Sequence, residues 1–266
     1  VYTAYSDSLK PDKRQAYRKY NPTGIHFYNT SVDYGYINHR VNINGETAIN
    51  DKGAVATINA IALKASQSLT LTAIQRFYSY RYYSMFSAAF SDGGKVQNES
   101  GIYLGAMWTP SSRLSVLAYS DYAYFPWARY LVSEKSHSWD NLIQASYRLS
   151  PLLTLNSRYR LRMREEDYND KELKSKYLID KTEHRARLSL VYANTHWSAK
   201  TQGDVSYVVY PDELSDKPSS FGWMVSQNMA YTNSWISAAA NVGYFHTHDY
   251  NSRIYTYENG TLYTFS

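Results

Sequence analysis

Arginine is the residue type whose spacing most clearly suggests chemistry in this sequence. Four arginines occupy alternate positions between Leu153 and Arg164, and two more alternate between Glu183 and Tyr192. The six residues are Arg158, Arg160, Arg162, Arg164, Arg185 and Arg187. Guanidinium groups bind carboxylates and phosphates through paired hydrogen bonds. Six of them on one wall could therefore attract anionic solutes, lipopolysaccharide phosphates or a nucleic-acid backbone.

The same arginines could instead be neutralised within the protein. Several acidic residues lie close to them in the sequence, namely Glu165, Glu166, Asp167, Glu183 and Asp204. Pairing with these carboxylates would give a lattice of ion pairs inside a barrel and no transport role. Only a wide, unplugged lumen would favour transport.

Residue types that usually carry catalysis or metal binding do not form a site in this sequence. His246 and His248 would share one face of a strand, but no third ligand is nearby, so an exposed loop end is the better interpretation. Glu165 and Glu166 stand among charges of both signs, which is typical of a solvated loop. Cysteine is absent, as are the glycine-rich phosphate-binding and nucleophile motifs. We therefore predict no catalytic residue, no metal, no cofactor and no enzyme activity.

The elements that must position the arginines are β-strands. The chain has 266 residues and 29 tyrosines, and no stretch approaches the roughly 20 consecutive apolar residues of a membrane-spanning helix. Between Thr30 and Asp249, apolar residues recur at every second position, and tyrosine, threonine and valine are frequent. Tight connections are predicted at 38–40, 66–68, 110–112, 150–151, 194–195 and 232–234. Long polar connections are predicted at 81–98, 126–137, 165–181 and 211–220.

Short and long connections alternate from residue 67 onward, with tight ones roughly every forty residues. A transmembrane barrel has short turns at one end and long loops at the other. A β-propeller repeats at a similar spacing, but it needs four strands per blade. Each repeat here offers two strands of about twelve residues, close to the length of a membrane crossing, and about fourteen crossings fit the chain.

The two faces of the predicted strands differ in polarity. A lipid-facing barrel has apolar side chains outside and polar ones inside, whereas a soluble sandwich shows the same alternation with the polar face outward. Trp108, Trp197 and Trp235 lie near tight turns. A second aromatic group crowds the ends of the long connections and comprises Tyr78, Tyr80, Tyr82, Tyr83, Tyr122, Tyr124, Phe125 and Trp127. Two such belts are what the two membrane interfaces select, so the aromatic residues favour the barrel.

Several stretches of the chain are similar to a known family. They are 125–130, 76–83 with Phe86 and 90–93, 45–48 with 51–54, and 253–259 with 262–265. These stretches resemble the barrel portion of a Bacteroidota outer-membrane protein family that contains helix-hairpin-helix domains. The resemblance covers nearly the whole chain. It implies a signal peptide and periplasmic helix-hairpin-helix repeats before the barrel, and closing strands after it. The DNA-binding role that the family name implies falls on no residue of this sequence.

The sequence therefore predicts an all-β fold, an antiparallel up-and-down transmembrane β-barrel that is partial and truncated at both ends. Residues 1–266 form one barrel segment, with a strand end and a long loop at 1–30 and strand-turn-strand repeats at 31–266. We expect the outer membrane of a Gram-negative bacterium. The expected partners are outer-membrane lipid and lipopolysaccharide, other envelope proteins, and DNA only through a region not present in this chain.

Two classes of function remain open. The first is a non-enzymatic channel, an anchor or a DNA-related envelope component. The alternative is a soluble all-β module that binds glycan or protein. Recovery from a cell without detergent would distinguish them, because only the soluble module would leave the membrane fraction.

Overall fold

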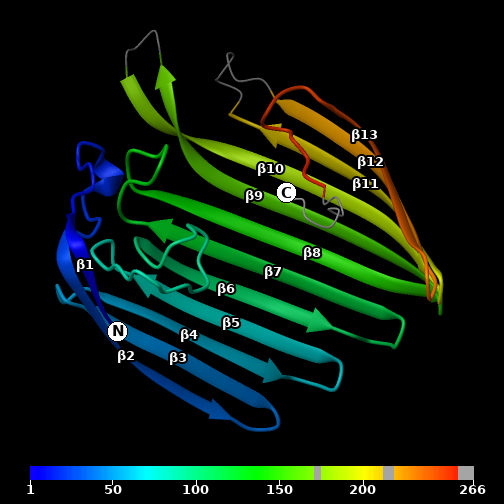
Figure 1. The fold of residues 1–266 in the computed structure, drawn as a ribbon, viewed down its shortest axis with the longest axis horizontal. Helices are drawn as coiled ribbons and strands as arrows, with labels where there is room; N and C mark the ends of the chain where they lie inside the picture. Colours follow the sequence, from blue (N-terminus) through cyan, green and yellow to red (C-terminus); the bar gives the residue numbers. More distant parts are fainter. Residues whose placement is uncertain (171–174, 212–218, 257–266) are drawn as a thin grey trace. The chain divides into compact units, whose positions relative to one another are not determined.

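The computed structural model describes residues 1–170, 175–211 and 219–256. In these ranges the chain forms thirteen β-strands, each paired with its neighbour in the sequence, and one short 3-10 helix (Figure 1). The elements are β1 Tyr2–Leu9, η1 Ala16–Arg18, β2 Gly24–Ile37, β3 Val41–Asn50, β4 Val55–Lys64, β5 Leu69–Tyr78, β6 Glu99–Trp108, β7 Leu114–Phe125, β8 Ser136–Ser150, β9 Leu153–Asp170, β10 Ser175–Ala193, β11 Trp197–Val209, β12 Ser220–Thr232 and β13 Ser237–Thr247. The predicted class, an all-β antiparallel up-and-down fold, is confirmed. Among the described residues, no helix has the length and apolar character needed to cross a membrane.

The described residues form two compact units. Unit 1 comprises Val1–Trp108, Leu117–Asn141 and Arg162–Lys181. Unit 2 comprises Thr109–Val116, Leu142–Leu161 and the described residues from 182 onward. Strands β1 to β6 belong to unit 1 and β11 to β13 to unit 2, while β7 to β10 contribute residues to both.

Asparagine side chains close two of the tight turns. Asn38 Oδ1 accepts hydrogen bonds from the backbone N–H groups of Arg40 and Val41, both at 2.8 Å. Asn194 Oδ1 does the same for His196 at 2.9 Å and Trp197 at 2.7 Å. Asparagine is favoured in turns because its side-chain oxygen can accept a hydrogen bond from a backbone N–H group two residues later. The six predicted tight connections are confirmed, at 38–40, 65–68, 109–113, 151–152, 194–196 and 233–236.

The predicted long connection at 165–181 is wrong. Strand β9 runs to Asp170 and β10 begins at Ser175, so 165–170 and 175–181 are strand, and only 171–174 lie outside the described residues. Its charges find partners: Glu165 accepts a hydrogen bond from the His137 N–H at 2.7 Å, and Asp167 pairs with Lys176 at 2.5 Å. Opposite charges on neighbouring strands stabilise a sheet. The strands therefore continue through this stretch, although its charged composition is typical of a loop. Short and long connections therefore do not alternate strictly.

The connections 79–98 and 126–135 lie close to their predicted positions, whereas most of the predicted connection 211–220 lies outside the described residues. Near the start of the chain, β1 is followed by a connection at 10–23 that contains η1, and β2 begins at Gly24. The span 1–30 thus holds one whole strand, one connection and the start of a second strand.

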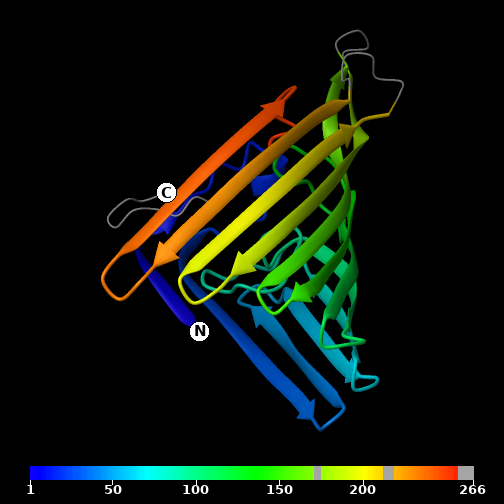
Figure 2. The same ribbon diagram turned by 90° about the vertical axis from the view of Figure 1, so that its right-hand side faces the viewer.

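In unit 2, the polar face of the strands is buried and the apolar face is exposed. Ser189, Gln202 and Ser226 are paired in register across β10, β11 and β12, and all three are at most 6% exposed. The next row on the opposite face contains Leu188 and Val225, which are 55% and 49% exposed. Figure 2 shows β11, β12 and β13 side by side in this unit. A soluble sandwich would have the reverse polarity.

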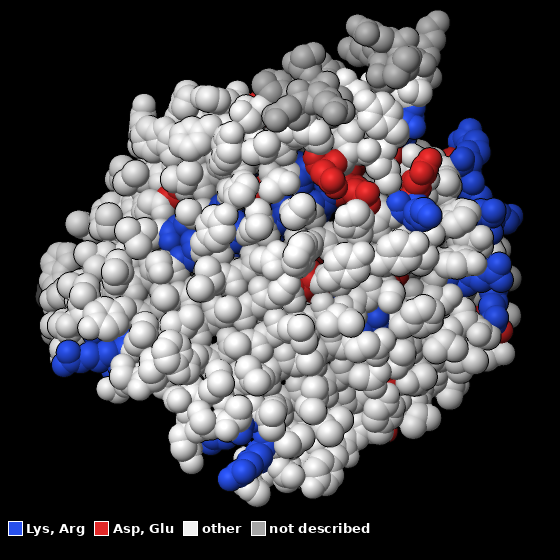
Figure 3. Space-filling view, turned by 180° about the vertical axis from the view of Figure 1, so that it is seen from behind, with Lys and Arg blue, Asp and Glu red and all other residues white. Residues whose placement is uncertain are grey.

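Unit 1 has the same reversed polarity. Ile43, Ile61 and Leu104 belong to one cross-strand row, completed by an alanine, and all three are exposed. Arg76 and Glu99 point to the other face and are fully buried. In the space-filling view most of the visible surface carries no charge (Figure 3).

The aromatic residues divide differently from the predicted two belts. Trp108, Trp197 and Trp235 are exposed beside tight turns, and Tyr122 and Tyr124 are exposed near a long connection, as predicted. The prediction is wrong for a second group, which is buried and comprises Tyr78, Tyr82, Tyr83 and Phe125. Tyr78 and Tyr82 instead form a small core with Ala56, because the connection 79–98 folds back onto the strands that precede it. A connection that folds back thus buries rings that the sequence pattern had placed at an interface.

Candidate functional site

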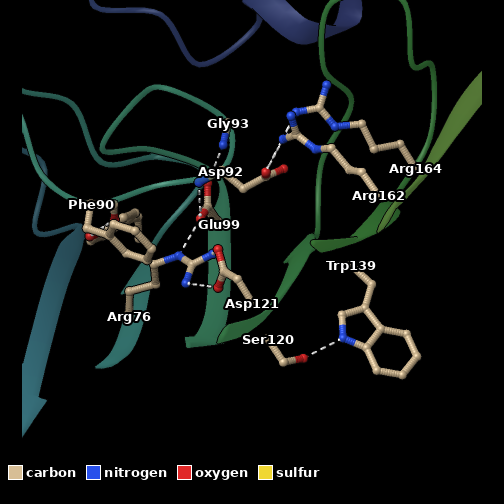
Figure 4. A network of polar contacts seen from close by, with 11 residues as sticks. Arg76, Phe90, Asp92, Gly93, Glu99, Ser120, Asp121, Trp139, Arg162 and Arg164 are labelled. Atoms are coloured by element: carbon tan, nitrogen blue, oxygen red, sulfur yellow. Dashed lines mark hydrogen bonds and ion pairs between the residues drawn. The ribbon is translucent and has the colours of Figure 1, made fainter. Parts of the chain in front are cut away.

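A buried cluster of charged residues lies on the polar face of unit 1 (Figure 4). The Arg76 guanidinium donates from Nε to Glu99 Oε1 and from Nη1 to Asp121 Oδ1 at 2.7 Å. Its Nη2 donates to Asp121 Oδ2 at 3.2 Å. We call Arg76, Glu99 and Asp121 the buried triad. Two carboxylates share one guanidinium, and a fork-shaped pair of the kind formed with Asp121 is among the strongest in proteins.

Gly101 makes room for the buried triad. It lies opposite Arg76 in the β5–β6 register. A Cβ atom at this position would lie 2.6 Å from Arg76 Cζ and 2.7 Å from the backbone oxygen of Tyr122. The backbone oxygen cannot yield as a flexible side chain could, so only glycine admits the guanidinium here.

We therefore expect Gly101→Ala to lower the free energy of unfolding by about 1–3 kcal/mol, the usual cost of an extra methyl group in a packed site. Gly203→Ala is the matched control, because a Cβ at this strand glycine would meet nothing within 4 Å. Urea unfolding in lipid vesicles would measure both variants. Equal stability of the two would contradict the assigned role of Gly101.

Glu99 also anchors the connection 79–98. Its Oε1 accepts a hydrogen bond from the Asp92 N–H at 2.9 Å, and its Oε2 accepts one from the Gly93 N–H at 2.8 Å. The Tyr78 hydroxyl donates to the Phe90 backbone oxygen at 2.9 Å, and the Phe90 ring centroid lies 5.0 Å from Arg76 Cζ. The connection is thus bound to the strand face at several points.

Asp92 brings a negative charge from this connection to the arginines of β9. Its Oδ1 pairs with Arg162 Nη2 and lies 3.6 Å from Arg164 Nη2. Arg162 Nε is also 3.9 Å from Asp140 Oδ2. The Asp92 side chain is only 6% exposed, so its charge is held against these two arginines rather than in bulk water. The connection therefore neutralises part of the predicted arginine patch.

The other four predicted arginines belong to unit 2. Arg158, Arg160, Arg185 and Arg187 line one cavity of about 230 Å³, together with Asp204 and Tyr255. Arg187 Nε donates to Asp204 Oδ1 at 2.5 Å, and Arg185 Nη2 donates to Glu183 Oε2 at 3.3 Å. The structure thus gathers four of the six arginines around one cavity. Their attraction for an anion stays a prediction.

The predicted pairing of the arginines with nearby carboxylates is seen in unit 2, whereas in unit 1 a carboxylate outside the predicted set takes part. Glu183 and Asp204 are the partners of Arg185 and Arg187, as expected. In unit 1 Arg162 pairs with Asp92, which lies 70 residues earlier in the chain, and more distantly with Asp140. Asp92 reaches Arg162 because the connection 79–98 folds against β9.

Arg129 is a further cation of unit 1, on the connection 126–135. Its Cζ lies 3.6 Å from the centroid of the Phe125 ring, and its Nε is buried without a hydrogen-bond partner. Within the described ranges no carboxylate pairs with it. Burial lowers the pKa of the Arg129 guanidinium from its usual value, and Asp92 and Glu99 partly oppose this effect. An arginine nevertheless stays protonated in proteins, so Arg129 is a cation.

The histidines of the predicted pair make ring contacts. The ring centroids of His246 and His248 are 5.7 Å apart, and His248 also packs on Phe221. Among the described residues, one group of possible metal ligands comprises His137, Glu165 and Asp180. Each offers one ligand atom, and these atoms lie within 4.8 Å of one another. His137 Nδ1 lies 3.0 Å from Glu165 Oε2, so these two residues satisfy one another as an ion pair or hydrogen bond.

Comparison with known proteins supplies no family for this chain. No family model matches the sequence, and no curated protein matches it. Two of the solved structures to which the chain is similar are of one protein. One is the deltaS2 mutant of the monoaromatic hydrocarbon channel TodX, with 11% identity, a TM-score of 0.35, and coverage of 86% of this chain and 76% of that chain. The other is the Pseudomonas putida toluene transporter TodX, with 10% identity, a TM-score of 0.32, and coverage of 92% and 82%.

Sequence reasoning missed the buried triad and Asp92. Arg76 lies among threonine and isoleucine on its face of β5, and Glu99 and Asp121 belong to the next two strands. The sequence signal for the triad was a single arginine on one strand face, followed by one carboxylate on each of the next two strands. Recognising it requires the β5–β6 register. The register cannot be read from the sequence, because a long connection separates these two strands.

Proposed function

We propose that this chain is the membrane-spanning part of a non-enzymatic outer-membrane β-barrel that conducts small anionic solutes. One observation carries the proposal: polar residues are buried and large apolar residues are exposed on the strands of both units. Lipid would cover the exposed apolar face, and water would fill the polar interior.

The exposed apolar residues argue against the soluble alternative. Leaving a leucine or valine side chain in water forgoes about 1.5–3 kcal/mol of burial energy. Soluble proteins rarely expose continuous apolar patches larger than a few hundred Å². Cross-strand rows such as Leu188, Val225 and Tyr244 continue over several strands, which is the pattern that lipid contact favours.

The buried polar residues support the same proposal. Ser189, Gln202 and Ser226 would be unusual in the interior of a soluble sandwich, where a buried polar group costs free energy unless it is bonded. The side-chain oxygens Gln202 Oε1 and Ser226 Oγ have no hydrogen-bond partner among the described residues. Buried water molecules bound within a polar barrel interior would satisfy such groups. The arginines at the unit 2 cavity would favour anions among the solutes that enter.

Cell fractionation of the full-length protein and one lipid-face variant tests this proposal. We expect the wild type to stay in the outer-membrane fraction after an alkaline wash and to dissolve only in detergent. Val225→Arg places a charge on a side chain that is 49% exposed in the structure. Such a change costs about 2–4 kcal/mol near the centre of a bilayer. We therefore expect less of this variant in the membrane and faster degradation.

Ser112→Arg is the matched control, because this exposed residue lies in the tight turn 109–113. Its membrane yield should equal that of the wild type. If the wild type is recovered without detergent, or if Val225→Arg behaves like Ser112→Arg, the membrane-spanning function is refuted and the soluble binding module is favoured. A DNA-related role stays a prediction that rests on the family resemblance alone.

A further inference from the structure

Unit 1 contains a cavity of about 310 Å³ that the channel function does not use. The connections 10–23, 79–98 and 126–135 form most of its wall, and Arg164 of β9 completes it. We call it the connection cavity. Its volume lies at the lower end of the range for small-molecule sites, about 300–1,000 Å³. A ligand of the size of one or two sugar rings suits this volume.

Hydrogen bonds between residues far apart in the sequence hold the walls of the connection cavity in place. Asn98 donates from Nδ2 to the Trp127 backbone oxygen at 2.8 Å and accepts from the Trp127 N–H at 2.8 Å. The Trp127 indole donates to the Ala16 backbone oxygen at 2.9 Å. Gln97 Nε2 donates to the Tyr80 backbone oxygen at 2.9 Å. A site that is already ordered costs a ligand little conformational entropy.

One side of the cavity is aromatic. The ring of Tyr20 lies 4.8 Å from that of Tyr80 and 5.0 Å from that of Trp127, measured between centroids. The face of an aromatic ring carries partial negative charge, so it attracts the weakly positive C–H groups on the flat side of a sugar ring. Aromatic walls combined with a few placed polar groups are typical of small-molecule sites.

The other side of the cavity carries charged groups. The side chains of Arg129, Arg164 and Asp92 line it. Asp92 is paired with Arg162, but no carboxylate among the described residues pairs with Arg129. The Arg129 guanidinium therefore keeps hydrogen-bonding capacity for an anionic ligand. Lys95 also lines the cavity, so cations outnumber the single carboxylate.

We infer that the connection cavity binds a small anionic sugar, a pyranose that carries a carboxylate or a phosphate group. The anionic group would accept hydrogen bonds from the guanidinium groups of Arg129 and Arg164, and a sugar hydroxyl would donate to the Asp92 carboxylate. The sugar ring would lie against Tyr20, Tyr80 and Trp127. This inference goes beyond the proposed channel, because the walls of the cavity exist whether or not solute passes through the protein.

Calorimetric titration of the purified full-length protein in detergent tests the inference. The probes are glucuronate, glucose 1-phosphate, neutral glucose and inorganic phosphate. We expect glucuronate or glucose 1-phosphate to bind at least about tenfold more tightly than glucose and than inorganic phosphate, a difference of about 1.4 kcal/mol. Arg129→Gln should weaken the binding of the anionic sugar by at least about tenfold, since it removes a buried charge-assisted bond.

Arg14→Gln is the matched control, because the Arg14 side chain is 89% exposed and lies outside the cavity wall. It should bind like the wild type. Phosphorylated and dephosphorylated lipopolysaccharide, tested in the same way, would distinguish a lipid headgroup from a free sugar as the source. Either source supports the inference if Arg129→Gln weakens its binding by at least about tenfold. Equal affinity for glucuronate and glucose, or unchanged binding by a folded Arg129→Gln protein, would overturn it and leave the channel proposal untouched.

Discussion

Replacing Arg76 with methionine is expected to lower the free energy of unfolding by about 3–5 kcal/mol, the usual effect of removing one partner of a buried ion pair. The reason is that two buried carboxylates, Glu99 and Asp121, would remain without a cationic partner. Glu99 is fully buried and Asp121 is 7% exposed, so neither carboxylate can recover its hydration when the guanidinium is lost. Urea unfolding of the protein in lipid vesicles, followed by tryptophan fluorescence, would measure the change.

A compensated variant keeps this prediction testable even if Arg76→Met folds poorly. In the triple variant Arg76→Met, Glu99→Gln, Asp121→Asn, no buried charge lacks a partner. The amide oxygen of Glu99→Gln can still accept from one of the two backbone N–H groups that Glu99 binds. Much of the stability should therefore return, because a buried ion pair is often replaceable by neutral groups. Arg14→Met, at an exposed arginine, should have no measurable effect. If the triple variant is no more stable than the single one, stranded charge is the wrong explanation.

Reversing two charges at the unit 2 cavity is expected to reverse the ion preference of the protein. This prediction depends on the proposed channel. Arg158 and Arg160 both line the cavity, and their replacement with glutamate changes its charge by four units. At a distance of about 8 Å, one unit charge contributes roughly 0.5 kcal/mol even at the dielectric constant of water. The change should therefore alter the ratio of anions to cations in the pathway by at least about tenfold.

Planar bilayers with a salt gradient measure this preference through the reversal potential. The wild type should favour anions, and Arg158→Glu with Arg160→Glu should favour cations. Arg40→Glu is the control, because Arg40 lies in the exposed turn 38–40. If the protein does not conduct, the channel function fails. If the double variant keeps the anion preference of the wild type, the arginines do not set it.

The parts of the fold that depend on neighbouring residues were predictable from the sequence. Strand alternation follows from a period of two, and turns such as those at Asn38 and Asn194 depend on one side chain and its next few backbone groups. The pairing of Arg187 with Asp204 was also predictable, because a tight turn joins β10 to β11 and sets their register.

The parts that depend on long connections were not predictable. Asp92 meets Arg162 only because the connection 79–98 lies on the strand face, and no local pattern reveals that path. Tyr78 and Tyr82 were predicted at an interface for the same reason. They lie at or just after the end of β5, as predicted, but the connection 79–98 buries them. Charged composition was a poor guide at Glu165 and Asp167, where cross-strand partners extend the strands.

If the chain spans the membrane as proposed, the buried triad, which joins the consecutive strands β5, β6 and β7, has a consequence for biogenesis. Arg76 alone in the bilayer would be a costly charge, and so would Glu99 or Asp121, until all three meet. Insertion of one strand at a time would therefore pass through a high free-energy barrier. We expect these three strands to enter the membrane as one preassembled block, with their charges already neutralised, and Gly101 to matter as much for the rate of insertion as for the final stability.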